Sequence, residues 1–145
     1  MKKVFLLLLA FAGLQLAQAQ DEILGKWKTI DDETGQAKSI IEIYKQNGKY
    51  YGKIVQLLTE ENKDGVCRTC KGKYANKNII GLVILKDLEY DADDKEWEGG
   101  TIMDPKNAKE YSVYLALVEP DKLKVRGYIG FSLIGRTQYW YRVKE

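Results

Sequence analysis

The stretch Ser39–Leu58, SIIEIYKQNGKYYGKIVQLL, contains two runs rich in isoleucine, valine and tyrosine on either side of Asn47-Gly48. Residues of these types favour β-strands. Asn-Gly tolerates the positive φ angles that a two-residue hairpin turn requires at both central positions. The stretch therefore predicts an antiparallel hairpin with strands over residues 39–45 and 49–58.

The remainder of the chain repeats this pattern of short strands and tight turns. Alternating or continuous apolar residues predict further strands over 24–30, 79–88, 97–103, 110–118, 122–128 and 137–143. Turns are predicted at Asp91–Asp94 and at Asp104–Asn107, where Pro105 takes the favoured second position. A meander of about eight strands has exposed edges unless it closes. We therefore expect an all-β domain folded as an up-and-down barrel, with a β-sandwich as the alternative.

Gly25-Lys26-Trp27, on the first predicted strand, resembles the Gly-x-Trp signature of lipocalins and related small barrels. In those proteins the tryptophan plugs the closed end, and an arginine or lysine from a late strand lies across its ring. Such a cation–π contact contributes about 0.5–2 kcal/mol. Arg142 is the expected partner of Trp27, with Arg136 as a second candidate. We expect Gly25, Trp27 and Arg142 to be structural residues.

The first nineteen residues have the composition of a secretory signal peptide. Lys2 and Lys3 precede an apolar run over residues 4–16, and Ala17-Gln18-Ala19 is a small-x-small cleavage motif. We expect cleavage after Ala19 and one mature domain, residues 20–145, that is secreted or periplasmic. An uncleaved anchor is the alternative, but the run falls short of the about 18–20 apolar residues of a membrane span. No membrane span is expected after the signal is removed.

The charge balance indicates which partners the mature chain lacks. The chain has 23 Lys+Arg and 21 Asp+Glu, and loss of Lys2 and Lys3 leaves 21 against 21. A nucleic-acid-binding domain needs an excess of basic residues on one face. We therefore expect no nucleic-acid partner, and the composition leaves the oligomeric state open.

The residue types of the chain argue against catalysis. There is no His, which removes most acid–base, nucleophilic and transition-metal schemes. The acidic clusters Asp31-Asp32-Glu33 and Asp91–Asp94 lie between predicted strands, where acidic residues mark solvated turns. The second cluster differs from a calcium loop, since Lys95 and Glu96 replace a ligand and a glycine. We expect a non-enzymatic protein with no catalytic residue, metal site or cofactor.

Cys67 and Cys70 are the only cysteines and lie in the longest predicted loop, residues 59–78. In an exported chain a structural disulfide is the default, and closing so small a loop contributes about 2 kcal/mol. A thiol redox site is a second interpretation, because C-x-x-C is the spacing of disulfide exchange catalysts. The third is a zinc ion shared by two chains, because one chain cannot supply four ligands.

Aromatic residues and one glycine-flanked segment are the candidates for a binding site. Tyrosine offers a flat apolar ring and a hydroxyl group, which suit a ligand pocket, although barrel packing uses the same residues. The segment 127–135, GYIGFSLIG, is a lid over a barrel mouth, a contact surface or a bulged strand. We expect a small apolar or amphipathic ligand. The candidate contacts are Tyr44, Tyr114, Tyr128, Phe131 and Trp140. A cell-envelope scaffold module with a solid barrel is the alternative, and a redox protein using the two cysteines is the third.

The segments 125–130, VRGYIG, and 133–142, LIGRTQYWYR, closely resemble the ending of a bacterial secreted family known as domain of unknown function 2147. Residues 25–35, GKWKTIDDETG, resemble its opening, and the segments at 39–44, 51–54, 67–70 and 104–105 match in between. Ala108 departs from the pattern, which tends to have glycine there, and Asn107 is expected to take the left-handed conformation. The resemblance implies a lipocalin-like barrel in the cell envelope and no established activity.

Overall fold

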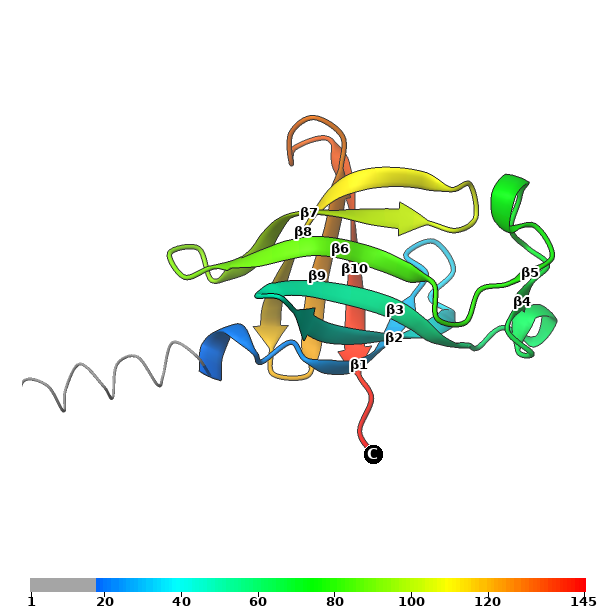
Figure 1. Ribbon diagram of the computed structural model, residues 1–145, viewed down its shortest axis with the longest axis horizontal. Coiled ribbons are helices and arrows are strands. Elements are labelled where there is room, and N and C mark those ends of the chain that lie inside the picture. Colours follow the sequence, from blue (N-terminus) through cyan, green and yellow to red (C-terminus); the bar gives the residue numbers. More distant parts are fainter. Residues whose placement is uncertain (1–17) are drawn as a thin grey trace, which may run out of the picture.

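Eight antiparallel strands close into a barrel in the computed structural model, which describes residues 18–145 (Figure 1). The barrel strands are β1 (Gly25–Ile30), β2 (Ala37–Gln46), β3 (Lys49–Leu57), β6 (Val83–Asp91), β7 (Glu96–Asp104), β8 (Lys109–Glu119), β9 (Lys122–Tyr128) and β10 (Gly135–Arg142). Their order around the barrel is β1-β10-β9-β8-β7-β6-β3-β2. Each strand pairs with its neighbour in the chain, and β1 pairs with β10 to close the barrel. The predicted up-and-down barrel is confirmed.

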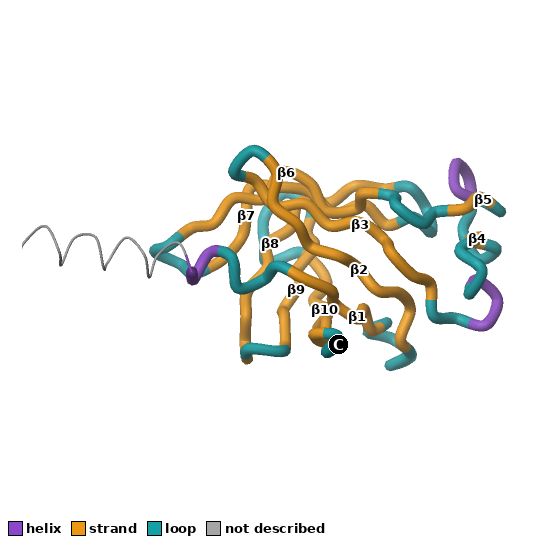
Figure 2. Tube along the Cα trace, turned by 60° about the horizontal axis from the view of Figure 1, so that its bottom comes forward, coloured by secondary structure: helices purple, strands orange, loops and turns teal. Residues whose placement is uncertain are grey.

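The connection between β3 and β6 forms a small crosslinked segment outside the barrel. It contains η1 (Glu60–Asn62), β4 (Val66–Cys67), η2 (Gly72–Tyr74) and β5 (Lys77–Asn78), and β4 pairs with β5. Figures 1 and 2 both show this segment at the end of the barrel opposite the N-terminal helical turn. We call the end near this segment the open end and the other the closed end.

The strand predicted over 79–88 begins later than expected, at Val83. Ile79 is only 3% exposed, and its backbone N–H donates to the carbonyl of Gly65 in the crosslinked segment rather than to a barrel strand. A turn then follows, in which Gly81 has a φ of 87°. The apolar residues before Val83 therefore join the crosslinked segment to the barrel, a role that strand periodicity alone does not distinguish from pairing.

Large side chains fill the inside of the barrel. The most deeply buried aromatic residues, each at most 2% exposed, are Trp27, Tyr50, Trp97 and Trp140. Aliphatic side chains from eight further inward positions are buried to the same extent: Ile41, Ile43, Ile54, Leu85, Leu88, Val113, Leu115 and Leu123. A Cβ atom at Gly52 would lie 2.8 Å from Leu85 Cδ1 and 3.1 Å from Ile41 Cγ2. Protein interiors in which side chains lie this close together leave few voids larger than a water molecule.

The closed end is sealed by Trp27 and Arg142. The Arg142 guanidinium carbon lies 4.3 Å from the Trp27 ring centroid. The same guanidinium donates to the carbonyl oxygens of Glu22 at 2.6 Å, Leu24 at 3.1 Å and Pro120 at 3.2 Å. The predicted cation–π pair is confirmed for Arg142. The second candidate, Arg136, lies at the open end.

Residues 20–24 form a strap across the closed end that the sequence analysis did not foresee. Trp97 Nε1 donates to the carbonyl of Gln20 at 2.9 Å, and Trp27 Nε1 donates to that of Ile23 at 2.8 Å. The Tyr50 hydroxyl donates to Asp21 at 2.8 Å, and this bond lowers the pKa of the Asp21 carboxyl. Residues 1–17 of the predicted signal peptide lie outside the described residues. Cleavage after Ala19 would leave every acceptor of the strap in the chain.

The turn between β7 and β8 corrects one expectation. The left-handed residue is Ala108, with a φ of 59°, and not Asn107. The N–H of Ala108 donates to the Asp104 carbonyl at 2.8 Å, and Asn107 instead uses its side-chain oxygen to accept from the N–H of Lys109. The turn therefore needs its left-handed residue one position later, where a Cβ atom is strained.

Replacing Arg142 by Ala should destabilise the protein by about 2–4 kcal/mol, because the cation–π contact and the bonds to three carbonyl oxygens are lost together. Arg136→Ala is the matched control, and its exposed ion pairs should be worth less than about 1 kcal/mol. Urea unfolding measures both changes. Equal losses in the two variants would contradict the proposed seal.

Replacing Ala108 by Gly should stabilise the protein by about 1 kcal/mol, because glycine adopts a positive φ without steric cost. Asn107→Gly is the control and should not stabilise, since it removes the acceptor for Lys109 N–H and relieves no strain. Thermal unfolding compares the two variants. A lower midpoint for Ala108→Gly than for the parent chain would show that the left-handed turn is wrongly assigned.

Candidate functional site

The predicted ligand contacts do not converge on one site. Tyr44 lies on the outer face of β2, next to Ile43, which points inward. Tyr114 and Tyr128 lie on the outer faces of β8 and β9, with ring centroids 6.4 Å apart. Trp140 is buried inside the barrel and is 1% exposed. Among the candidates, the structure pairs only Tyr114 with Tyr128.

The fifth candidate, Phe131, lies in the connection between β9 and β10. We call residues Ile129–Ile134 the apolar loop. Its exposed fractions are 67% for Ile129, 56% for Phe131, 84% for Leu133 and 61% for Ile134. Large apolar side chains concentrated on six residues are unusual on a monomer surface and mark interaction sites. Sequence reasoning had named Phe131 alone, although the glycines that flank the loop had marked the whole segment as unusual.

Hydrogen bonds hold the apolar loop in its exposed conformation. The N–H of Ile129 donates to the carbonyl of Ile134 at 3.2 Å, and the N–H of Ile134 donates to that of Phe131 at 3.1 Å. From β9, Arg126 Nε donates to the Ser132 carbonyl at 2.6 Å, and its Nη2 donates to the Leu133 carbonyl at 3.3 Å. Because a charged group satisfies these carbonyls, the loop has a defined shape.

The inward-facing residues become smaller, more polar and more exposed toward the open end. Gln138 shares the inward face of β10 with Trp140 and is half-buried, and its side chain accepts from Trp140 Nε1 at 3.3 Å. Thr29 and Ser39 bond to each other through their hydroxyl groups at 2.8 Å. Gly127 faces Ile102 at this level. This mouth mixes polar and apolar groups above the filled interior.

Two hollows among the described residues lie on the outside of the barrel. One lies at the closed end, around Gly25, Glu42 and Arg142. The other lies beside the turn between β6 and β7, lined by acidic residues that include Asp87 and Glu98. Neither hollow is lined by the buried side chains of the interior, so neither is the ligand pocket predicted inside the barrel.

The acidic clusters stabilise turns. Asp31 Oδ1 accepts from the N–H groups of Glu33 and Thr34 at 3.0 and 2.9 Å, which lowers the pKa of the Asp31 carboxyl. Asp91 Oδ1 likewise accepts from Asp93 N–H at 2.8 Å. Within residues 18–145, no group of three or more His, Cys, Asp or Glu residues is arranged to hold a metal ion.

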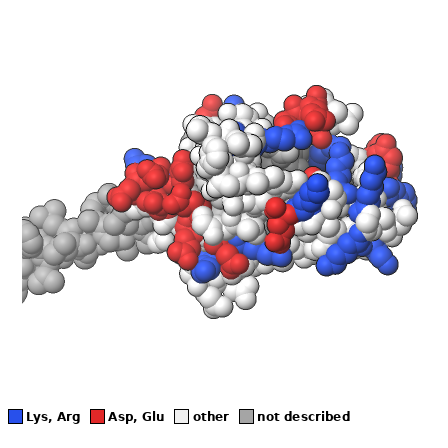
Figure 3. All heavy atoms as spheres, turned by 90° about the horizontal axis from the view of Figure 1, so that it is seen from above, with Lys and Arg blue, Asp and Glu red and all other residues white. Residues whose placement is uncertain are grey.

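Negative charge accumulates at the β6–β7 turn. Burial and the neighbouring carboxylates raise the pKa of Glu96 and of Glu98. The neighbouring carboxylates repel one another because they form an acidic surface at the closed-end side of the barrel. This surface is visible in red at the left of the molecule in Figure 3.

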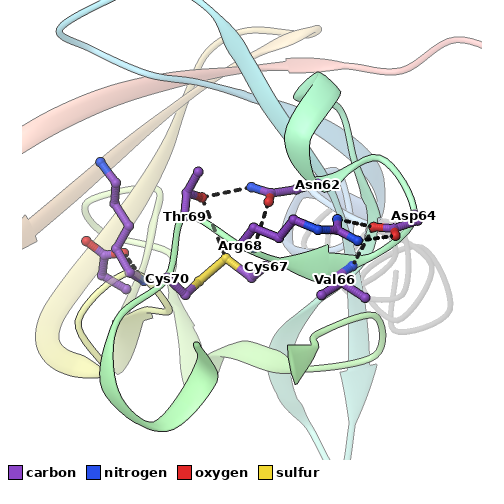
Figure 4. Close-up of a disulfide and its surroundings, with 9 residues drawn as sticks. Asn62, Asp64, Val66, Cys67, Arg68, Thr69 and Cys70 are labelled. Atoms are coloured by element: carbon purple, nitrogen blue, oxygen red, sulfur yellow. Dashed lines mark hydrogen bonds and ion pairs between the residues drawn. A yellow bond between two sulfur atoms is a disulfide. The ribbon is translucent and has the colours of Figure 1, made fainter. Parts of the chain in front are cut away.

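Cys67 and Cys70 form a disulfide in the crosslinked segment (Figure 4). Their exposed fractions are only 5% and 6%, whereas a thiol-exchange site needs an accessible sulfur. Beside them Arg68 makes a bidentate pair with Asp64 at 2.7 and 2.8 Å, which holds the pKa of the Asp64 carboxyl well below its usual range. Asn62 accepts from Arg68 N–H. These contacts support the structural interpretation of the disulfide over the redox and zinc alternatives.

Comparison with solved structures defines the class of the fold. The Helicobacter pylori protein HP1028, described as belonging to the lipocalin family, matches with a TM-score of 0.66 and 22% identity over 85% of this chain and 84% of that chain. At this identity the likeness shows the fold alone, a lipocalin-like barrel.

Residues 25–142 match the family described as "Uncharacterized protein conserved in bacteria (DUF2147)", so the chain belongs to this family. The family resemblance and the fold class predicted from the sequence are both confirmed. No curated protein sequence matches the chain. Among residues 18–145, no helix has the length and apolar character of a membrane span.

Replacing both cysteines by Ala should lower stability by about 2 kcal/mol and leave the barrel folded, because the disulfide closes a very small loop. Urea unfolding followed by fluorescence of the buried tryptophans measures the change. Loss of the cooperative transition would show that the barrel depends on the crosslinked segment, against the structure described above.

Proposed function

We propose that this chain is a non-enzymatic binding protein that acts through the open end of a filled barrel. The apolar loop is the contact surface, and the barrel is the scaffold that holds it. The exposure of Ile129, Phe131, Leu133 and Ile134 is the observation that carries this proposal. An isolated exposed leucine is ordinary, but four large apolar side chains on one short loop indicate a surface that is covered in the working state.

The shape of the apolar loop supports a role in contact. A loop without function lowers its free energy by folding apolar side chains onto the barrel. Here Arg126 and the internal hydrogen bonds hold the side chains outward. The filled interior also supports a solid module over a carrier with a deep cavity, because ligand pockets usually enclose about 300–1,000 Å³.

A small amphipathic ligand at the mouth is the second candidate function. The half-buried Ser39, Gln138 and Tyr111 offer polar groups toward the open end. Tyr111 and Ile102 lie beside Gly127, two residues before the apolar loop. A ligand there would lie across the mouth with its apolar part against the loop. The polar groups would fix its orientation, as convergent polar groups do in other small-molecule sites.

A location outside the cytoplasm is part of the proposal. The predicted signal peptide and the Cys67–Cys70 disulfide support it, because disulfides persist in oxidising compartments. The family resemblance adds the expectation of a cell-envelope protein.

Photocrosslinking tests the proposed contact surface. A benzophenone amino acid in place of Phe131 should form adducts in the producing cells, because the loop is covered by a partner there. The control places the same group at Val118, which is 47% exposed near the end of β8. This position should form few adducts or none. Native mass spectrometry of the purified protein distinguishes the second candidate, which predicts a bound small molecule. No adduct at position 131 would refute the proposal.

A further inference from the structure

The face that carries the apolar loop also carries cations. The loop lies at the top of Figure 1, so it faces the viewer in Figure 3. In that view the middle of the face is uncharged, and Lys and Arg gather toward the crosslinked segment. The largest group of acidic residues lies at the opposite side, toward the β6–β7 turn, and smaller acidic groups lie among the cations. The near-zero net charge expected of the mature chain is therefore spread unevenly, with the largest acidic group in this view at the β6–β7 turn and most of the cations toward the crosslinked segment.

Three exposed lysines at this end come from two connections that touch. Lys71 and Lys73 flank the start of η2, and Lys106 lies in the β7–β8 turn. The backbone N–H of Lys71 donates to the carbonyl of Lys106 at 2.9 Å, which joins the two connections. Within the part of the chain that the structure describes, none of the three ammonium groups forms an ion pair. The disulfide ends at Cys70, directly before Lys71, and fixes the segment that bears these charges.

Residues beside the apolar loop suit an interface between water and lipid. Tyr128 precedes the loop, and tyrosine is enriched at the headgroup level of membranes because its ring is apolar and its hydroxyl polar. Arg126 lies behind the loop and forms no ion pair with a carboxylate among the described residues. From the tip of the apolar loop to its base, the side chains are thus apolar, then aromatic and then cationic.

The size and shape of the apolar loop favour lipid over a second copy of the chain. Four side chains present on the order of a few hundred Å². A stable protein interface covers about 800 Å² on each partner and needs a complementary surface. A protruding loop inserts into the acyl boundary of a bilayer without any matching groove.

We infer that this face docks on a bilayer that contains anionic phospholipid. The apolar loop enters the acyl boundary, and Lys71, Lys73 and Lys106 lie against the phosphate groups. This inference rests on the proposed function, since it names the partner of the same loop. Each lysine near an anionic surface strengthens binding roughly fivefold, and the effect weakens within a Debye length.

Vesicle flotation tests the inference with purified protein. Vesicles of phosphatidylcholine with about 30% phosphatidylglycerol should bind the protein more tightly than phosphatidylcholine alone, and salt should weaken this preference. Phe131→Ser with Leu133→Ser should lower partitioning at least about tenfold. Lys71→Ala with Lys73→Ala should lower it by roughly the same factor on anionic vesicles only.

Matched controls separate docking from loss of folding or charge. Val118→Ser removes an exposed apolar side chain, and Lys28→Ala with Lys95→Ala removes two exposed positive charges elsewhere; neither should change partitioning more than about twofold. In addition, Phe131→Trp should be quenched by brominated lipid, whereas the native tryptophans, at most 2% exposed, should not. Quenching of Phe131→Trp would place the loop in the bilayer directly.

Three outcomes would overturn the inference. These are failure to bind either vesicle, equal losses in the control variants, or a loop-dependent dimer in sedimentation velocity without vesicle binding. If vesicle binding fails but Phe131 crosslinks to a protein in cells, only the lipid inference falls and the proposed function stands. If both fail, the apolar loop is not a contact surface.

Discussion

The stacking of Arg142 on Trp27 is the contact on which the rest of the barrel depends. It joins the first barrel strand to the last, and the same guanidinium holds the carbonyls of the N-terminal strap and of the β8–β9 turn. It lies where β1 pairs with β10, and this pairing leaves the closed sheet without the free edge that a meander otherwise exposes. Closure also fixes which side chains face inward. Trp97 and Tyr50 then complete the closed end through their bonds to Gln20 and Asp21.

Much of this architecture could be predicted because it follows local rules. Strand periodicity, the Asn47-Gly48 turn and the Gly25-Lys26-Trp27 motif specify strands, a hairpin and a plug, and each is found in the structure. The strap could not be predicted in this way, because its role comes from carbonyl groups that every residue possesses. The late start of β6 could not be predicted for a related reason. Ile79 is buried in the crosslinked segment, and an apolar residue of the same type would also suit a strand.

The candidate site was harder to predict than the fold. Strand alternation specifies which residues share a face, but the candidate contacts were chosen by residue type. Tyr44 and Tyr114 lie on outer surfaces, and Trp140 lies in the core. Because side chains fill the interior, the rim of the barrel is the better candidate for a contact surface. The apolar loop was visible in the sequence as an apolar run between glycines. Its fixed, outward shape depends on Arg126, whose partners within the loop are backbone carbonyls and leave no mark in the sequence.

A nitrogen–proton correlation spectrum recorded with and without anionic lipid nanodiscs would test the central claim, that the barrel is a filled scaffold acting through its rim. The indole N–H groups of Trp27, Trp97 and Trp140 report on the interior, and the backbone amides of residues 129–134 report on the apolar loop. The account predicts that the loop amides broaden or shift while the three indole signals stay in place. Shifts of the indole signals with an unchanged loop would contradict it, since they would show that the interior admits a ligand.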